Sequence, residues 1–195
     1  FIHVSTDEVY GENNTKIAFD ENQNFAPTNP YSASKAAAEM FINAYGNAYG
    51  LRTKVVRSNN IYGIRQYPEK LIPSVSYKLL NGKKAQIHGN GSNLRSFLHV
   101  KDFCIGMETI VKKGKNDVYN IASANEYSVI EIVERICDIL GVRFSDKVDF
   151  IKDRPHNDSR YLINCDKIRS LDWSETKNFE EELPKVVNYY KSFKV

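Results

Sequence analysis

A tyrosine and a lysine four positions apart could together supply a general base. Tyr31 and Lys35 stand in the segment Tyr-Ser-Ala-Ser-Lys, and residues at i and i+4 share one face of a helix. An ammonium group beside a phenol stabilises the phenolate and lowers the tyrosine pKa from about 10. The spacing therefore predicts a tyrosine that removes a proton, although a surface pair of this kind also occurs by chance.

Hydroxyl and carboxyl side chains end the first apolar run of the chain. Ser5, Thr6, Asp7 and Glu8 close the strand-like residues 1–5. The carboxyl ends of parallel strands are where α/β sheets bind ligands. Two adjacent carboxyls can take opposite roles, because repulsion and burial keep one protonated while the other is ionised. We therefore interpret Asp7 and Glu8 as an acid–base pair; the competing interpretation is a solvated strand end.

The elements around these residues indicate a βαβ unit. Residues 1–5 and 53–57 have the pattern of strands. Between them, Asn29-Pro30 signals the start of a helix, with asparagine as the N-cap and proline in the first turn. Gly50 signals where that helix ends. A strand, a helix and a strand in this order predict an α/β fold with a parallel sheet.

The rest of the chain alternates between helix and strand patterns. A capping box at Ser128 opens a helix that Gly141 ends, and Pro184 predicts a kink or a late start in the last helix. A polar, aromatic loop is expected over residues 59–69. The expected strands are 85–88 and 94–98, on either side of a turn at 89–91, followed by 118–122 and 148–151. The expected helices are 30–49, 71–80, 102–113, the one opened at 128, 166–171 and 180–193.

Composition excludes several classes of protein. The 195 residues include 27 Lys+Arg and 24 Asp+Glu, a net charge of +3, which is too small to indicate a nucleic-acid partner. The sequence contains no apolar stretch of 18 residues, which is the length that would predict a membrane span. No targeting segment is visible. The three cysteines lie far apart, and each stands in an apolar or helical context. We therefore interpret them as small buried hydrophobes in a reducing compartment, and we expect a cytoplasmic location and no metal site.

Two segments carry a resemblance to a known family. Residues 5–11 (STDEVYG) and 29–39 (NPYSASKAAAE) resemble the extended short-chain dehydrogenase/reductase superfamily. Within it, the Asp7-Glu8 pair after Thr6 resembles the nucleotide-diphosphate-hexose 4,6-dehydratases, and especially the dTDP-glucose 4,6-dehydratases. Five further segments match this family in order along the chain: 60–63, 68–73 (PEKLIP), 95–97, 119–121 and 153–155.

The resemblance implies a divided fold. It implies part of a Rossmann-type doubly wound parallel sheet, over residues 1–58 and about 93–122, that binds NAD. It implies a smaller mixed α/β domain, over residues 59–92 and about 123–195, that binds a nucleotide sugar. The glycine-rich NAD fingerprint of the family is absent, because Gly89-Asn90-Gly91 lacks the third glycine. The chain is therefore expected to be the C-terminal portion of a longer enzyme.

The resemblance also implies a reaction, the dehydration of a nucleotide-diphosphate glucose to its 4-keto-6-deoxy form. Tyr31 would take the proton of the sugar 4-hydroxyl while NAD accepts hydride from C4. Lys35 would lower the Tyr31 pKa and bind the nicotinamide ribose, and Thr6 would bind O4. Glu8 would then remove the C5 hydrogen, and Asp7 would protonate the departing 6-hydroxyl.

Further residues are implied as ligands of the substrate diphosphate, sugar and base. Arg95 and Arg154 are candidates for the diphosphate, because guanidinium binds phosphate oxygens with two aligned donors. His88 either stacks on the base or is an ordinary strand histidine. The remaining substrate contacts implied are Asn60, Lys70, Leu71 and Asn120, with Asn60 also close to NAD. A homodimer through the helix of residues 30–49 is the partner expected by analogy.

Two departures and two alternatives stay open. His156 and Asn157 stand where the family has glycine and histidine, and Ile64 replaces a common proline. The first alternative is another extended superfamily member, a nucleotide-sugar epimerase or decarboxylase, against which the Asp7-Glu8 pair argues. The second is a cofactor-less binding module with vestigial catalytic residues. Whether the nucleotide is dTDP or UDP is not decided by the sequence.

Overall fold

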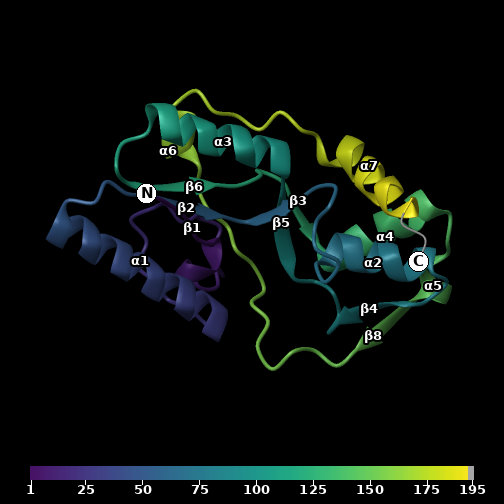
Figure 1. Cartoon of the computed structure of the whole chain (residues 1–195). Helices are drawn as coiled ribbons and strands as arrows, with labels where there is room; N and C mark the ends of the chain where they lie inside the picture. The colour runs from purple at the N-terminus through teal and green to yellow at the C-terminus, as the bar shows by residue number, and fades with distance from the viewer. Residues whose placement is uncertain (193–195) are drawn as a thin grey trace.

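The structure is a computed structural model that describes residues 1–192 (Figure 1). Its strands are β1 (Ile2–Val4), β2 (Lys54–Ser58), β3 (Asn60–Tyr62), β4 (Ala85–His88), β5 (Leu94–His99), β6 (Val118–Ile121), β7 (Glu126–Ser128) and β8 (Val148–Ile151). Its helices are the 3-10 helix η1 (Asp7–Tyr10), α1 (Pro30–Tyr49), α2 (Leu71–Leu80), α3 (Val100–Lys113), α4 (Val129–Leu140), α5 (Phe144–Lys147), α6 (Asp166–Arg169) and α7 (Phe179–Lys191). None of the helices within residues 1–192 is both long and apolar enough to cross a membrane.

A parallel sheet of order β1-β2-β6 forms the first part of the molecule. Val4 pairs with Val56, and Val56 with Tyr119. The helix α1 connects β1 to β2, and Figure 1 shows it on one side of this sheet, with α3 and α6 on the other. The sheet thus has helices on both faces, as the α/β prediction requires.

The helix α1 begins and ends where the sequence predicts. The Asn29 side chain accepts a hydrogen bond from the Ser32 backbone N–H at 2.9 Å, and Ser32 Oγ accepts one from the Asn29 N–H at 3.2 Å. Pro30 occupies the first turn, where a missing N–H costs nothing. Gly50 ends the helix with φ of 67°, a left-handed conformation that favours glycine.

The other strands pair in a way that local sequence patterns do not predict. Residues 60–62, expected in a loop, form β3, because β5 supplies a parallel partner with Asn60 opposite Phe97. The strands on either side of residues 89–91 do not pair with each other. Instead β4 pairs with β8, whereas β5 pairs with β3 and, antiparallel, with β7.

Two clusters of buried apolar side chains support these sheets. The first surrounds β2, β6 and α3, and the second lies among α2, α4 and α7. Ile163, Ile168 and Trp173 return to the first cluster, so the last third of the chain contributes to both. The capping box at Ser128 opens α4 as predicted, with Glu131 Oε2 accepting from the Ser128 N–H at 2.7 Å.

The last helix corrects the expectation of a late start. α7 begins at Phe179, five residues before Pro184, and continues past it to Lys191. Asn178 caps it by accepting from the Glu180 N–H at 2.8 Å. Its N-terminal turns are therefore in place before the proline. The expected end at residue 193 lies outside the described residues.

Candidate active site

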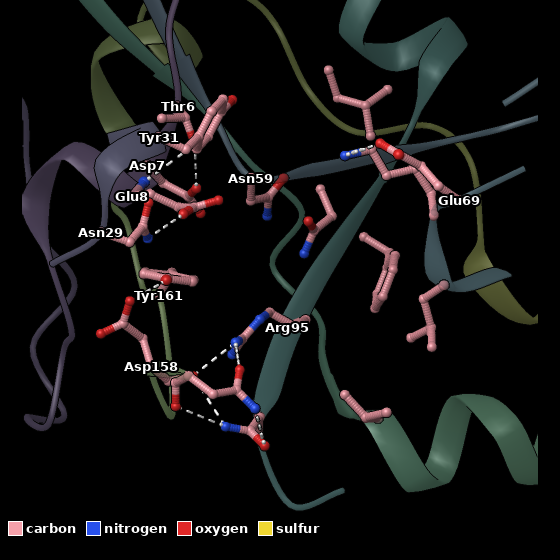
Figure 2. A pocket seen from close by; sticks show the side chains of 18 of the residues that line it. Thr6, Asp7, Glu8, Asn29, Tyr31, Asn59, Glu69, Arg95, Asp158 and Tyr161 are labelled. Atoms are coloured by element: carbon pink, nitrogen blue, oxygen red, sulfur yellow. Dashed lines mark hydrogen bonds and ion pairs between the residues drawn. The ribbon is translucent and has the colours of Figure 1, made fainter. Parts of the chain in front are cut away.

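A pocket of about 740 Å³ lies where β1 and β2 end (Figure 2). Its walls come from the residues after these strands, the starts of α1 and α2, and residues 154–161. This volume is ample for a small-molecule ligand. The predicted site residues that line it are Thr6, Asp7, Glu8, Tyr31, Asn60, Lys70, Leu71, His88, Arg95 and Arg154. Lys35 and Asn120 are not among its lining residues.

The 3-10 helix η1 sets the geometry of the carboxyl pair. Thr6 is its N-cap, and Thr6 Oγ1 accepts from the Glu8 backbone N–H at 3.3 Å. The same hydroxyl donates to Asp7 Oδ1 at 3.3 Å. The sequence predicted a strand ending here but not the helical turn that follows it. That turn brings the threonine hydroxyl and both carboxyls to one pocket (Figure 2).

Asp7 has the environment of a neutral carboxylic acid. The residue is 5% exposed, and its burial, together with the negative charge of Glu8, raises its pKa to about 8. The Thr6 hydrogen bond and the positive charge of Arg95 oppose this rise. Asp7 is therefore mainly protonated near pH 7 and can donate a proton.

Glu8 is held by a residue that sequence analysis placed only at the helix start. Asn29 Nδ2 donates to Glu8 Oε2 at 3.1 Å, and the two side chains meet in Figure 2. Because Asn29 also caps α1, one side chain links the carboxylate to the helix that carries Tyr31. The N-cap signal was visible in the sequence, but the contact with Glu8 depends on the fold.

The relation between Tyr31 and Lys35 corrects the pKa prediction. Lys35 Nζ donates to the Val4 carbonyl oxygen at 2.5 Å, so the ammonium faces β1. Partial burial raises the pKa of Tyr31, and the negative charge of Glu8 raises it further, while a hydrogen bond with Thr6 opposes them. The lowering by Lys35 that the i, i+4 spacing predicted is absent from this arrangement.

Arg95 is engaged by the protein. Its two terminal nitrogens donate to the carbonyl oxygens of Leu94 and Asp158, each at 2.7 Å, and to Asn157 Oδ1 at 3.3 Å. Its guanidinium also lies 4.9 Å from the ring centre of Tyr161. Arg95 therefore supports the segment around residue 158 while it lines the pocket.

Four other predicted residues also line the pocket. Asn60 and Lys70 are exposed, and Leu71 begins α2. His88 is half-buried at the end of β4, where its Nδ1 lies 3.3 Å from the Lys152 carbonyl oxygen.

The segment 153–158 contains the residues that depart from the family pattern. His156 Nε2 lies 3.0 Å from Asp158 Oδ1. Asn157 Nδ2 donates to Asp153 Oδ1 at 3.0 Å. Both departing residues line the pocket, as does the exposed Arg154. The altered residues thus keep their own contacts within this segment.

Asn120 has a structural position, which corrects its assignment as a substrate contact. The residue is fully buried. Its Oδ1 accepts from the Tyr10 hydroxyl at 2.8 Å, and its Nδ2 donates to the carbonyl oxygens of Phe19 and Asn164 at 3.2 and 3.1 Å. These bonds join β6 to segments far away in the sequence. They engage both Oδ1 and Nδ2 of Asn120, the side-chain atoms that would otherwise bind a substrate.

Fold and site together define the class of the chain. A β1-α1-β2 unit with Thr6 after β1, and Tyr31 and Lys35 on α1, is that of an extended short-chain dehydrogenase/reductase. A sequence profile described as GDP-mannose 4,6 dehydratase matches residues 1–186. The chain belongs to the GDP-mannose 4,6-dehydratase family.

Individual relatives agree with this assignment. The chain is 44% identical over 193 residues to the trifunctional UDP-glucose 4,6-dehydratase/UDP-4-keto-6-deoxy-D-glucose 3,5-epimerase/UDP-4-keto-L-rhamnose-reductase of Arabidopsis thaliana, covering 97% of this chain and 29% of the relative. It is 40% identical to the crystal structure of dTDP-glucose 4,6-dehydratase from Bacillus anthracis in complex with NAD, with a TM-score of 0.92 and coverage of 98% and 61% of the two chains. It is 34% identical to the dTDP-glucose 4,6-dehydratase of Streptomyces venezuelae with NAD and TYD bound, with a TM-score of 0.95 and coverage of 98% and 60%. The chain thus spans less than two thirds of each of these relatives.

Proposed function

We propose that this chain is the catalytic and sugar-binding part of an NAD-dependent nucleotide-sugar 4,6-dehydratase, with dTDP-glucose as its substrate. The observation that carries the proposal is the buried Asp7 beside Glu8, in one pocket with Thr6 and Tyr31; burial and the charge of Glu8 raise the pKa of Asp7 to about 8. A dehydration needs an acid for the leaving hydroxyl and a base for the neighbouring C–H, and this pair offers both.

Tyr31 and Lys35 are the residues that would hold NAD, together with Asn60. The fit is supported by exposure, because Val4 and Tyr31 are 42% and 54% exposed beside the Lys35 ammonium. When bound there, NAD would supply the hydride acceptor for the oxidation at C4 and, once reduced, the hydride donor for C6. As a phenolate, Tyr31 would take the proton of the sugar 4-hydroxyl and become a neutral phenol, and Thr6 would hydrogen-bond O4.

The elimination is the task of the carboxyl pair. A 4-ketone acidifies the C5 hydrogen, and Glu8, oriented by Asn29, removes it as a proton. Asp7 gives its proton to the 6-hydroxyl as the C6–O bond breaks, so that water leaves and a C5–C6 double bond forms. The raised pKa of Asp7 keeps that proton available near neutral pH.

Substrate binding would extend from the carboxyl pair toward the cations. Arg154, an exposed residue that lines the pocket, is the candidate for the diphosphate, together with Arg95, which is held by the segment around residue 158. Lys70, Leu71 and His88 are the candidates for the nucleotide.

We further propose that the first apolar cluster belongs to an NAD-binding domain and the second to a sugar-nucleotide domain. We also propose that the protein is a cytoplasmic homodimer that pairs through α1.

Product analysis tests this function. The assembled enzyme, meaning this chain joined to an N-terminal NAD-binding half of its own or of a relative, is incubated with dTDP-glucose and with UDP-glucose. A product that has lost one water and carries a 4-ketone supports the proposal and identifies the nucleotide. A product of unchanged mass and altered stereochemistry would favour an epimerase, and release of CO2 from a nucleotide uronic acid would favour a decarboxylase. Binding without conversion would favour a binding module.

A further inference from the structure

Asn59 is a buried amide without a hydrogen-bond partner. The residue is 6% exposed, and neither its Oδ1 nor its Nδ2 has a partner within the described chain. It nevertheless borders the pocket. Figure 2 shows its side chain between the group of Thr6, Asp7 and Tyr31 and the segment that carries Glu69.

Such an amide is costly unless something binds it. Burying a carboxamide without hydrogen bonds opposes folding, which is why nearly all buried polar groups are paired. A second buried polar group without a hydrogen-bond partner among the described residues, the Ser5 hydroxyl, belongs to a residue that lines the same pocket. Ser5 follows β1 as Asn59 follows β2, these strands are neighbours, and Ser5 Oγ is also buried and unpartnered. Unpaired polar groups collected at one pocket indicate that a ligand completes them.

The chemistry of the pocket indicates which part of a ligand this would be. The substrate of the proposed function is a hexopyranose that is linked to the nucleotide through C1 and oxidised at C4. Two edges of its ring connect C1 with C4, one through C5 and the other through C2 and C3. Asp7 and Glu8 serve the C5–C6 edge in the proposed function. The opposite edge carries the neighbouring hydroxyls at C2 and C3. A neutral carboxamide offers one acceptor and one pair of donors, which matches two adjacent hydroxyls without ionising either.

We propose that the Asn59 carboxamide binds the C2–C3 hydroxyl edge of the hexose and so positions C4 at Tyr31. The proposal rests on the proposed function, since it assumes a hexose in this pocket. Asn59 is a positioning residue in this account. It orients the ring and takes no part in proton or hydride transfer.

Binding measurements with matched ligands test the proposal. Titration calorimetry would use the assembled enzyme with NAD bound and a Tyr31→Phe background that prevents turnover. The ligands are dTDP, dTDP-glucose and its 2-deoxy and 3-deoxy forms, or the UDP series if UDP-glucose is the nucleotide sugar converted. Asn59→Ala should weaken dTDP-glucose on the order of 10-fold and leave dTDP unchanged. Each deoxy analogue keeps only one of the two contacted hydroxyls, so Asn59→Ala should weaken its binding less than it weakens the binding of dTDP-glucose. Asn188→Ala, an exposed asparagine on α7, is the control and should change none of these affinities.

Other outcomes overturn the proposal in distinct ways. Equal losses for dTDP and dTDP-glucose, or for dTDP-glucose and both deoxy forms, would exclude a contact with the hydroxyls. Loss of NAD affinity alone would assign the amide to the cofactor. Urea unfolding adds a second readout, because a structural amide would make Asn59→Ala less stable, whereas removal of an unpaired buried group should leave stability unchanged or raise it. If the unmutated enzyme converts no nucleotide sugar and binds none better than the nucleotide alone, the proposed function fails as well.

Discussion

Asn29 Nδ2 donates a hydrogen bond to Glu8 Oε2 at 3.1 Å, while the same side chain caps the helix that carries Tyr31. One residue therefore fixes the position of the proposed C5 base relative to the proposed C4 base. A serine at this position retains an N-cap oxygen but has no amide donor for Glu8.

Asn29→Ser should separate these two roles. We expect stability to change by no more than a few tenths of a kcal/mol, because serine and asparagine are comparable N-caps. We expect the rate of C5 proton removal to fall by about 10-fold, the loss of one charge-assisted hydrogen bond that orients the base. Chemical denaturation measures the stability. The rate of C5 proton removal is measured by comparing substrates with hydrogen and with deuterium at C5. An Asn29→Ala variant, which lacks the cap as well, should lose about 1 kcal/mol of stability; equal stability of the two variants would contradict the capping role.

Asn120→Ala should affect folding rather than substrate affinity. The substitution removes three buried hydrogen bonds, those of Asn120 with the Tyr10 hydroxyl and with the carbonyl oxygens of Phe19 and Asn164. The Tyr10 hydroxyl still accepts from Arg57, and the Phe19 carbonyl oxygen still accepts from the Asn164 N–H. We expect a loss of about 1–3 kcal/mol in the free energy of unfolding, measured with urea, and an unchanged KM for the nucleotide sugar in the assembled enzyme. A stable variant with a strongly raised KM would restore Asn120 to the substrate site.

Asp7 should make stability fall as pH rises. Its pKa in the folded chain is about 8, above its value near 3.9 in an unfolded chain. Between these values the folded state holds a proton that the unfolded state has lost, so ΔG of unfolding decreases with pH, by at most about 1.4 kcal/mol per pH unit. The contribution is complete below about pH 4 and is lost as pH rises to about 8 and above. Asp7→Asn, which cannot ionise, should show a smaller decline in urea titrations at pH 6 and pH 8. Parallel declines in the two proteins would exclude a neutral buried Asp7.

The 195-residue chain alone should bind NAD weakly. No G-x-G-x-x-G segment occurs in it, so it lacks the helix N-terminus that holds a pyrophosphate in this class of fold. Calorimetric titration of the chain should detect no micromolar affinity, whereas the assembled enzyme should bind. Micromolar binding by the chain alone would show that other residues suffice for the cofactor.

The comparison of sequence and structure separates local from long-range determinants. The bounds of α1 and the start of α4 were predictable, because caps and glycine stops are written within a few residues. The strand β3 was not, because its pairing depends on β5, more than thirty residues away.

The site follows the same rule. The motif residues Thr6, Asp7, Glu8 and Tyr31 were predicted and meet in one pocket. Asn59 was missed, because no local pattern marks a buried amide without a partner. Asn120 was misassigned, because its burial beneath Phe19 and Asn164 depends on segments far along the chain.

The central claim is that Tyr31 acts before the carboxyl pair. Tyr31→Phe should slow the oxidation at C4 by about 10²–10⁴-fold. Asp7→Asn and Glu8→Gln should still permit that oxidation, since each acts only once the 4-ketone exists.

Rapid mixing of each variant of the assembled enzyme with the nucleotide sugar, followed by absorbance of the reduced nicotinamide, tests this order most directly. The account predicts that Asp7→Asn and Glu8→Gln accumulate reduced cofactor and a 4-keto sugar and then stall, while Tyr31→Phe accumulates neither. If both carboxyl variants instead block reduction of the cofactor as fully as Tyr31→Phe, the pair serves the oxidation or the fold, and the dehydratase proposal loses its main support.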